Sequence, residues 1–296
     1  MSQAGLDISD DAIRCIEYHR TPHGLVISKH FNQDLPDGLV VGGDIKDEKK
    51  FVSILSELAS KNKISYVKVS LPEEKAYLFQ TDVPSADFKS IAQNIDFKLE
   101  QNVPLSAADA LFQFDLMPEA VTGEALRASV SVVPKKYVEH YISLLKSAYL
   151  FPVAFEIVPK AIVAAYVPEH LPGTHLIVHV MNKKTGLYIV SEGVVCFTST
   201  ISWGSVDEEK ILMKEVERVH TYWVTREDVH TDIAEIVVVG LSMDRCEKII
   251  GVLGNGQGLH SMLPNVWNNA FDINAYVPPI IRSESLEYAV AAGLAL

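Results

Sequence analysis

The chain opens with short apolar segments that are separated by polar turns. Three strands are predicted in succession: Ala4–Ile8, Ala12–His19 and Leu25–His30. The turn between the first two is short and acidic, Ser9-Asp10-Asp11. A loop rich in proline, glycine and aspartate then leads to a helix near Asp47 to Lys61, because apolar residues share one of its faces: Phe51, Ile54, Leu55, Leu58 and Ala59. A further strand begins at Ile64.

The pattern changes after this strand. Ser85 is expected to cap a helix whose apolar residues fall at helical spacing: Phe88, Ile91, Ala92, Ile95 and Leu99. Two alternating strands follow, with apolar faces formed by Ala110, Phe112, Phe114, Leu116 and by Leu126, Ala128, Val130, Val132. A helix from Pro134, a strand at Val153–Val158 and a helix from Pro159 complete the segment. We interpret it as an α/β insertion.

The opening order of elements then returns. Val167–Thr174 carries two prolines and a glycine between apolar stretches, which is typical of a domain boundary. The elements predicted after it are strands at His175–Met181, Gly186–Ser191 and Val194–Ile201, a helix from about Val206 to Val224, and a strand at Glu235–Val239. The two halves share an order of elements without obvious residue identity, which predicts a duplicated fold with two units facing a cleft.

Composition and charge narrow the class of protein. The net charge is −12, from 26 basic and 38 acidic residues, which argues against binding nucleic acid or an anionic membrane through charge. The three cysteines show no metal-site spacing and lie in or beside apolar sequence, as buried thiols in a reducing compartment do. No signal peptide is visible, and no apolar stretch approaches the roughly 20 residues that a membrane span needs. We therefore expect a cytoplasmic protein.

Several segments of the chain, taken together, resemble those of a known family. The first is Gly5-Leu6-Asp7-Ile8 followed by Ile13-Arg14-Cys15-Ile16-Glu17. The others are Phe97–Pro104, Val132–Tyr137, Leu145–Leu150, Glu215–Trp223 and Tyr288–Leu296. They resemble the PilM proteins, which are actin-like components of type IV pilus assembly related to the division protein FtsA, and the first resembles the first phosphate motif of that family. The similarity covers nearly the whole chain and depends on the order and spacing of these segments.

This resemblance implies an α/β fold of the duplicated actin-like, ribonuclease H-like type, with two domains and an α/β insertion in the first. The first domain would span residues 1–168, with the insertion at about 85–158. A second, shortened domain would span residues 169–282, since Trp203-Gly204-Ser205 runs almost directly into the long helix. Residues 283–296 would form a C-terminal helix that packs back on the first domain.

The resemblance also implies a site for ATP and Mg²⁺ that is built from three elements. The residues of the first turn that correspond to the family motif are Asp7, Ser9, Asp10, Asp11 and Arg14. Asp7 would order a water molecule bound to Mg²⁺ if nucleotide binds. The second turn keeps Thr185 and Gly186, and the third element keeps Gly240 and Ser242.

These elements depart from the family pattern in ways that weaken a phosphate site. Ser9 replaces the usual glycine, and Asp10 and Asp11 replace small hydroxyl residues. At about 5 Å and an effective dielectric constant near 20, each carboxylate would repel one phosphate charge by roughly 3 kcal/mol. His179 and Met181 stand where the family has an acid and a glycine. We expect a degenerate site without ATP hydrolysis; ATP binding, and the alternative that the turns only connect strands, both stay open.

Three functions are compatible with this resemblance. The first is a scaffold of a type IV pilus or type II secretion platform, held at the membrane by the N-terminal cytoplasmic tail of a bitopic, PilN-like inner-membrane protein. In the family this tail lies in a groove, which here would be walled by the strand near Tyr66 to Leu71 and by the insertion. The alternatives are a working actin-like ATPase switch and an FtsA-like division protein. Self-association stays open.

Overall fold

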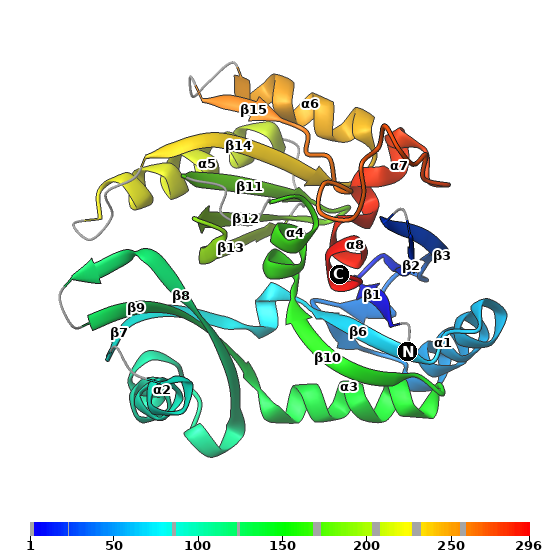
Figure 1. Ribbon diagram of the computed structural model, residues 1–296, viewed down its shortest axis with the longest axis horizontal. Helices are drawn as coiled ribbons and strands as arrows, with labels where there is room; N and C mark the ends of the chain where they lie inside the picture. Colours follow the sequence, from blue (N-terminus) through cyan, green and yellow to red (C-terminus); the bar gives the residue numbers. More distant parts are fainter. Residues whose placement is uncertain are drawn as a thin grey trace. The chain divides into compact units, whose positions relative to one another are not determined.

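The computed structural model describes residues 3–22, 24–84, 87–122, 125–167, 173–202, 208–226, 232–254 and 259–296 (Figure 1). Its internal contacts divide the chain into two units. One comprises Met1–Tyr18, Ser28–Val158 and Ala295, and the other comprises His19–Ile27, Pro159–Leu294 and Leu296. The grouping changes at Val158, whereas the sequence pattern places the boundary at Val167–Thr174, of which 168–172 lie outside the described residues. The domain limits given above stay predictions.

The first unit contains a five-stranded sheet in the order β10-β6-β1-β2-β3. Its strands are β1 (Ala4–Ile8), β2 (Ala12–Thr21), β3 (Gly24–Asp34), β6 (Tyr66–Leu71) and β10 (Phe151–Ile157). Strand β1 pairs antiparallel with β2 and parallel with β6, and β6 pairs parallel with β10. The predicted opening hairpin is therefore confirmed. The β10–β6 register shifts between Pro152 and Ala154, which leaves Val153 as an extra residue in the edge strand.

Helices α1 (Glu48–Asn62) and α3 (Lys135–Ser147) lie side by side and pack against this sheet. The Asp47 carboxylate caps α1 by accepting a hydrogen bond from the Lys50 N–H at 3.0 Å. Lys63 ends the helix in the left-handed conformation, with φ 53°. The apolar faces of both helices meet the strands in one core, which includes Leu6, Ile13, Phe51, Leu55, Val67, Tyr141 and Leu145.

A small hairpin occupies the loop before α1, where the sequence pattern predicts only a loop. Its strands are β4 (Val40–Val41) and β5 (Asp44–Ile45), with Val41 opposite Asp44. The two residues between them have positive φ angles, 55° at Gly42 and 78° at Gly43. Positive φ at both central positions is typical of a two-residue type I′ turn, which favours glycine.

The insertion forms a separate small layer. It consists of β7 (Tyr77–Pro84), α2 (Phe88–Asn102), β8 (Ala110–Thr122) and β9 (Ala125–Pro134), with short turns η1 (Glu73–Lys75) and η2 (Ala107–Asp109). The three strands form a sheet in the order β7-β9-β8. Helix α2 packs against this sheet through a core that includes Ile91, Ile95, Leu99, Ala128, Val130 and Val132.

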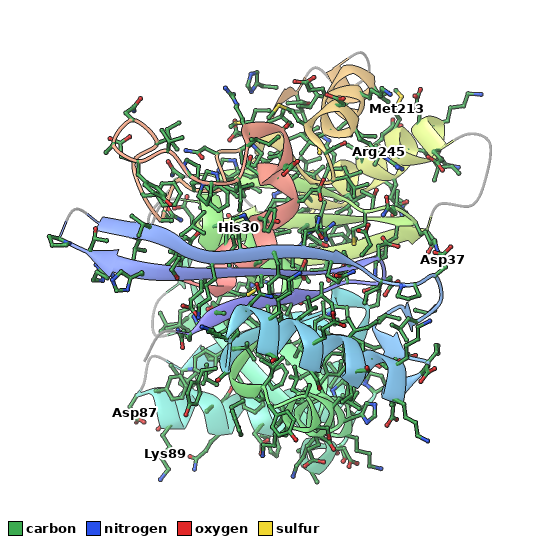
Figure 2. All side chains as sticks on the ribbon, turned by 90° about the vertical axis from the view of Figure 1, so that its right-hand side faces the viewer. His30, Asp37, Asp87, Lys89, Met213 and Arg245 are labelled. Carbon is green, nitrogen blue, oxygen red and sulfur yellow. The ribbon has the colours of Figure 1, made fainter. Side chains whose placement is uncertain are left out.

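Three features of the insertion differ from the sequence expectation. The sequence pattern does not predict β7. The cap of α2 is Asp87, labelled in Figure 2, which accepts hydrogen bonds from Lys89 N–H at 3.0 Å and Ser90 N–H at 3.2 Å, and the expected cap Ser85 lies outside the described residues. Finally, α3 and β10 belong with the main sheet, because β10 pairs with β6 and α3 enters the main core. The three-stranded insertion sheet itself ends with β9 at Pro134.

The second unit repeats the topology of the first. Its strands are β11 (Thr174–Val180), β12 (Lys184–Ser191), β13 (Val194–Ser202), β14 (Ile233–Gly240) and β15 (His260–Met262), in the order β13-β12-β11-β14-β15. The first three are antiparallel neighbours, while β14 pairs parallel with β11 and β15 pairs parallel with β14. Both sheets therefore have a three-stranded meander followed by two parallel strands, and the predicted duplication is confirmed.

Helices follow the strands of this unit. They are α4 (Val158–Tyr166), α5 (Glu208–Val224), α6 (Met243–Gly254), α7 (Arg282–Ser285), the turn η3 (Leu286–Tyr288) and α8 (Ala289–Leu294). The expected start of α5 near Val206 lies outside the described residues. Residues up to Leu294 are grouped with the second unit, where Gly293 approaches α4 so closely that a Cβ would lie 1.7 Å from the Ala161 carbonyl oxygen. Among the described residues, no helix is both long and apolar enough to cross a membrane.

Candidate functional site

Asp7, which the resemblance assigns to Mg²⁺, is buried in the first sheet with 5% of its surface exposed. Ser70 Oγ on β6 donates a hydrogen bond to Asp7 Oδ1 at 2.9 Å, and Ile8 N–H donates to the same Ser70 hydroxyl at 2.9 Å. The partner of Asp7 across the β1–β2 hairpin is Arg14, which is also buried. Hydrogen bonds between neighbouring strands thus fix the position of this carboxylate.

Ser9 closes the first turn on itself. Its N–H and its hydroxyl each donate to the Ala12 carbonyl oxygen at 3.0 Å, and its hydroxyl accepts from Ala12 N–H at 3.1 Å. The Asp11 carbonyl oxygen accepts a hydrogen bond from Leu35 N–H at 2.7 Å. These bonds account for a short turn between two strands without any ligand.

Asp10 binds backbone amides of the β4–β5 hairpin. Its Oδ2 accepts from Gly42 N–H at 2.9 Å and its Oδ1 accepts from Gly43 N–H at 3.1 Å. Each carboxylate oxygen therefore already serves a donor within the chain. Sequence reasoning missed this role; the only local signal is the Gly-Gly pair, which predicts a turn but not its partner.

In the second unit, Thr185 and Gly186 lie at the start of β12. Thr185 is fully buried. Gly186 pairs with His179 and lies beneath the ring of Tyr188, since a Cβ on Gly186 would be 2.0 Å from the Tyr188 hydroxyl. That hydroxyl lies 3.2 Å from His179 Nδ1. The glycine is thus explained by the space that a buried tyrosine needs.

Gly240 ends β14 with φ 127°, a conformation that residues with a side chain rarely adopt. It pairs with Val180 of β11, and a Cβ would lie 2.1 Å from the Val180 carbonyl oxygen. Ser242 is exposed, and its carbonyl oxygen accepts the first hydrogen bonds of α6, from Arg245 and Cys246. The surviving glycine is therefore also explained by close packing of two strands.

A pocket of about 520 Å³ lies beside the second and third elements, within the second unit. Its lining residues are Val180, Asn182, Glu208, Glu209, Ser242, Asp244, Arg245, Lys248 and Ile249. Arg245, labelled in Figure 2, lies near Glu208, with 3.9 Å between Nη2 and Oε2. Acidic groups outnumber basic groups in this lining, which disfavours a polyphosphate. The residues described here fit ATP and Mg²⁺ poorly, and the nucleotide assignment stays a prediction.

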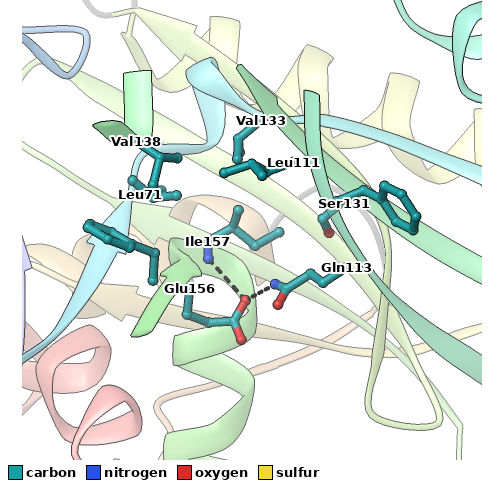
Figure 3. A pocket seen from close by; sticks show the side chains of 10 residues that line it. Leu71, Leu111, Gln113, Ser131, Val133, Val138, Glu156 and Ile157 are labelled. Atoms are coloured by element: carbon teal, nitrogen blue, oxygen red, sulfur yellow. Dashed lines mark hydrogen bonds between the residues drawn. The ribbon is translucent and has the colours of Figure 1, made fainter. Parts of the chain in front are cut away.

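A second pocket lies in the first unit, between the main sheet and the insertion sheet (Figure 3). We call it the edge pocket. It has a volume of about 160 Å³ and is lined by Leu71, Leu111, Phe112, Gln113, Ser131, Val133, Val138, Phe155, Glu156 and Ile157. It lies between β6 and the insertion, where the resemblance implies a groove. Strands β8 and β10 both contribute to it, and each is the outermost described strand of its sheet.

The edge pocket is mostly apolar, and its polar lining residues are Ser131, Gln113 and Glu156, of which the last two form a pair (Figure 3). Gln113 Nε2 of β8 donates a hydrogen bond to Glu156 Oε1 of β10, and Ile157 N–H donates to the same oxygen at 3.1 Å. This pair joins the two edge strands. The groove implied by the resemblance includes Leu71, but no local sequence pattern indicates Gln113 or Glu156.

The family model for "Type IV pilus assembly protein PilM" matches residues 5–211. Among solved structures, a "PilM-PilN type IV pilus biogenesis complex" matches with a TM-score of 0.82 and 17% identity, over 100% of this chain and 98% of that chain. A Bacteroides thetaiotaomicron protein of actin-like ATPase fold matches with a TM-score of 0.52 and 10% identity, over 92% and 93% of the two chains.

The cytoplasmic domain of EpsL, an inner-membrane component of the Vibrio cholerae type II secretion system, matches with a TM-score of 0.50 and 11% identity, over 81% of this chain and 82% of that chain. Identities this low carry information about the fold alone. They support the predicted actin-like α/β architecture. No curated protein sequence matches the chain.

Proposed function

The chain belongs to the PilM family of type IV pilus assembly proteins, and on that premise we propose that it is a scaffold that binds the N-terminal cytoplasmic tail of a PilN-like inner-membrane protein in the edge pocket. The tail would hold the chain at the inner face of the cytoplasmic membrane. The single observation that carries the proposal is an apolar pocket situated between two sheet edges.

The size and walls of the edge pocket suit one apolar side chain. Its volume of about 160 Å³ is close to the roughly 150 Å³ of an engineered apolar cavity that binds benzene. Leu71, Val133, Val138 and Ile157 give it aliphatic walls from four different elements. An apolar residue of an extended tail would therefore lose its contact with water on entering it.

The open edges of β8 and β10 offer main-chain hydrogen bonds to the same tail. An outermost strand presents N–H and C=O groups to which an extended peptide can pair, and pockets for alternate side chains then provide specificity. Half-exposed apolar side chains continue along β10, with Phe151 at 47% and Val153 at 50% exposure. A tail that leaves the pocket along this strand would cover them.

Two leucines of β8 provide a matched test. Leu111 lines the edge pocket and Leu116 does not, yet each is 41% exposed. Leu111→Glu places a charge at the pocket and should weaken tail binding about tenfold or more, which corresponds to about 1.4 kcal/mol. Leu116→Glu adds the same charge to the same strand and should bind like the natural protein.

The measurement is a calorimetric titration with a synthetic N-terminal tail of the PilN-like protein from the same organism. Circular dichroism of both variants checks that they are folded. If Leu111→Glu binds the tail as tightly as Leu116→Glu, the edge pocket is not the binding site. Lack of binding by the natural protein would reject the scaffold function itself.

A further inference from the structure

The Gly42-Gly43 turn carries two adjacent amide donors that meet one carboxylate. Successive backbone N–H groups in a turn can form a concavity that suits an anion. Here that anion is Asp10, with one oxygen 2.9 Å from Gly42 N and the other 3.1 Å from Gly43 N. Hydrogen bonds to an ionised acceptor are about twice as strong as neutral ones. The first turn of the fold is thus attached firmly to this hairpin.

The opposite side of the same turn is attached to helix α3. The hydroxyls of Tyr137 and Tyr141 both donate to the Gly43 carbonyl oxygen, each at 2.8 Å. Tyr141 is 1% exposed, so its hydroxyl has little access to water as an alternative partner. Gly43 therefore joins a carboxylate on one side to two tyrosines on the other.

The turn is also packed tightly against the end of β6. A Cβ on Gly43 would lie 2.4 Å from Pro72 Cγ and 2.7 Å from the Tyr137 hydroxyl. The following residue, Asp44, forms an ion pair with Lys75, with 2.7 Å between Asp44 Oδ1 and Lys75 Nζ. A displacement of the turn would therefore be transmitted to the Pro72–Lys75 segment and to α3.

Both of these elements supply walls of the edge pocket. Leu71 lines it and immediately precedes Pro72. Val138 lines it and lies on α3 between Tyr137 and Tyr141. We propose that Asp10 is a positioning residue for the edge pocket: by fixing the Gly42-Gly43 turn it holds the end of β6 and helix α3 at the separation that a bound tail requires.

This role rests on the proposed function. It explains why the first turn carries a carboxylate at Asp10, which a phosphate site would disfavour. Both Asp10 oxygens accept amide protons, so the carboxylate works as a fixed part of the scaffold. The arrangement needs no nucleotide to assemble. The chain would then present a formed tail-binding pocket at all times.

Hydrogen exchange measured by mass spectrometry tests the role without relying on any partner. In Asp10→Ala, amide exchange should rise about tenfold or more in three segments: 40–45, 70–75 and 135–142. Asp10→Asn keeps the side-chain volume, but its amide group would face an amide donor, so the same three segments should respond. It also serves if the alanine variant does not fold. The control is Asp34→Ala, which removes an exposed carboxylate at the end of β3.

Titration with the synthetic tail described above completes the test. Faster exchange in all three segments with tail binding weakened severalfold, and neither effect in Asp34→Ala, would support the role. Faster exchange confined to 40–45, or unchanged tail affinity in a folded Asp10 variant, would overturn it. If the natural protein binds no tail yet all three segments respond to Asp10→Asn, the tail-binding function fails while the attachment of Asp10 to β6 and α3 stands.

Discussion

Gly240 offers a direct test of whether the glycines of the expected phosphate turns serve a ligand or the fold. Gly240→Ala adds a Cβ that would lie 2.1 Å from the Val180 carbonyl oxygen and 2.9 Å from the Val180 nitrogen. Both atoms belong to the backbone of β11, so relief requires the two strands to separate. The φ angle of 127° adds conformational strain for any residue with a side chain.

The cost can be worked from these two terms. Holding a non-glycine residue in such a conformation costs about 1–3 kcal/mol. Separating the strand ends also strains the Leu241 N–H bond to the Val180 carbonyl oxygen, which is 3.1 Å long and contributes about 1 kcal/mol. We expect the free energy of unfolding of the second unit to fall by about 2–4 kcal/mol, a large share of the roughly 5–15 kcal/mol that domains possess.

Urea unfolding followed by tryptophan fluorescence measures this, because Trp223 and Trp267 are buried in the second unit. The matched control is Gly251→Ala inside α6, where an added Cβ meets no atom within 4 Å. Replacing a helical glycine by alanine should stabilise by about 0.5–1 kcal/mol. With no nucleotide added, Gly240→Ala should thus lower the free energy of unfolding and Gly251→Ala should raise it. A loss below about 1 kcal/mol for Gly240→Ala would refute the packing explanation.

Two further predictions concern the ligand and the tyrosines. Millimolar Mg-ATP should leave the melting temperature unchanged, because the residues of the expected site fit nucleotide poorly. A ligand present at 100 times its Kd would stabilise the folded protein by about 2.7 kcal/mol, so a clear rise in Tm would contradict this prediction and support a nucleotide site. Burial raises the pKa of Tyr141 to about 12, above the value of about 10 in the unfolded chain. The contribution of Tyr141 to the free energy of unfolding is therefore fully present below pH 10 and is lost as the pH rises from about 10 to 12. Across this window the urea midpoint of unfolding should fall less steeply in Tyr141→Phe than in the natural protein.

The sequence predicts those elements whose apolar residues repeat at a regular spacing. Helix α1 and the β1–β2 hairpin lie within a few residues of their expected ends, because one apolar face per element is enough to locate them. Strand β7 reads Tyr-Leu-Phe-Gln-Thr-Asp-Val-Pro, and Val83 is the only one of these eight residues that is buried. It lacks a clean alternation, so its place beside β9 depends on tertiary pairing.

The contacts of the candidate sites could not be predicted from local sequence patterns, because they join residues that are far apart in the sequence. Asp10 binds amides 32 and 33 residues away, and nothing near Asp10 in the sequence indicates that partner. A carboxylate in a turn gives the same local sequence pattern whether it would repel a phosphate or accepts hydrogen bonds from a neighbouring loop. The edge pocket draws residues from five separate elements, so it exists only after the insertion sheet and the main sheet have formed.

The bulge in β10 has a consequence for the chain before it meets any partner. β10 pairs with β6 on one side only among the described strands, and an open outer edge with exposed Phe151 and Val153 is a template on which another copy could add a strand and begin to aggregate. Pro152 removes one backbone donor from this strand, and the register shift at Val153 interrupts its regular repeat. Such interruptions hinder a long, flat pairing between copies yet tolerate a short peptide. The irregular edge should thus lower the tendency of copies to pair through β10, and it stays compatible with the proposed binding of a short tail.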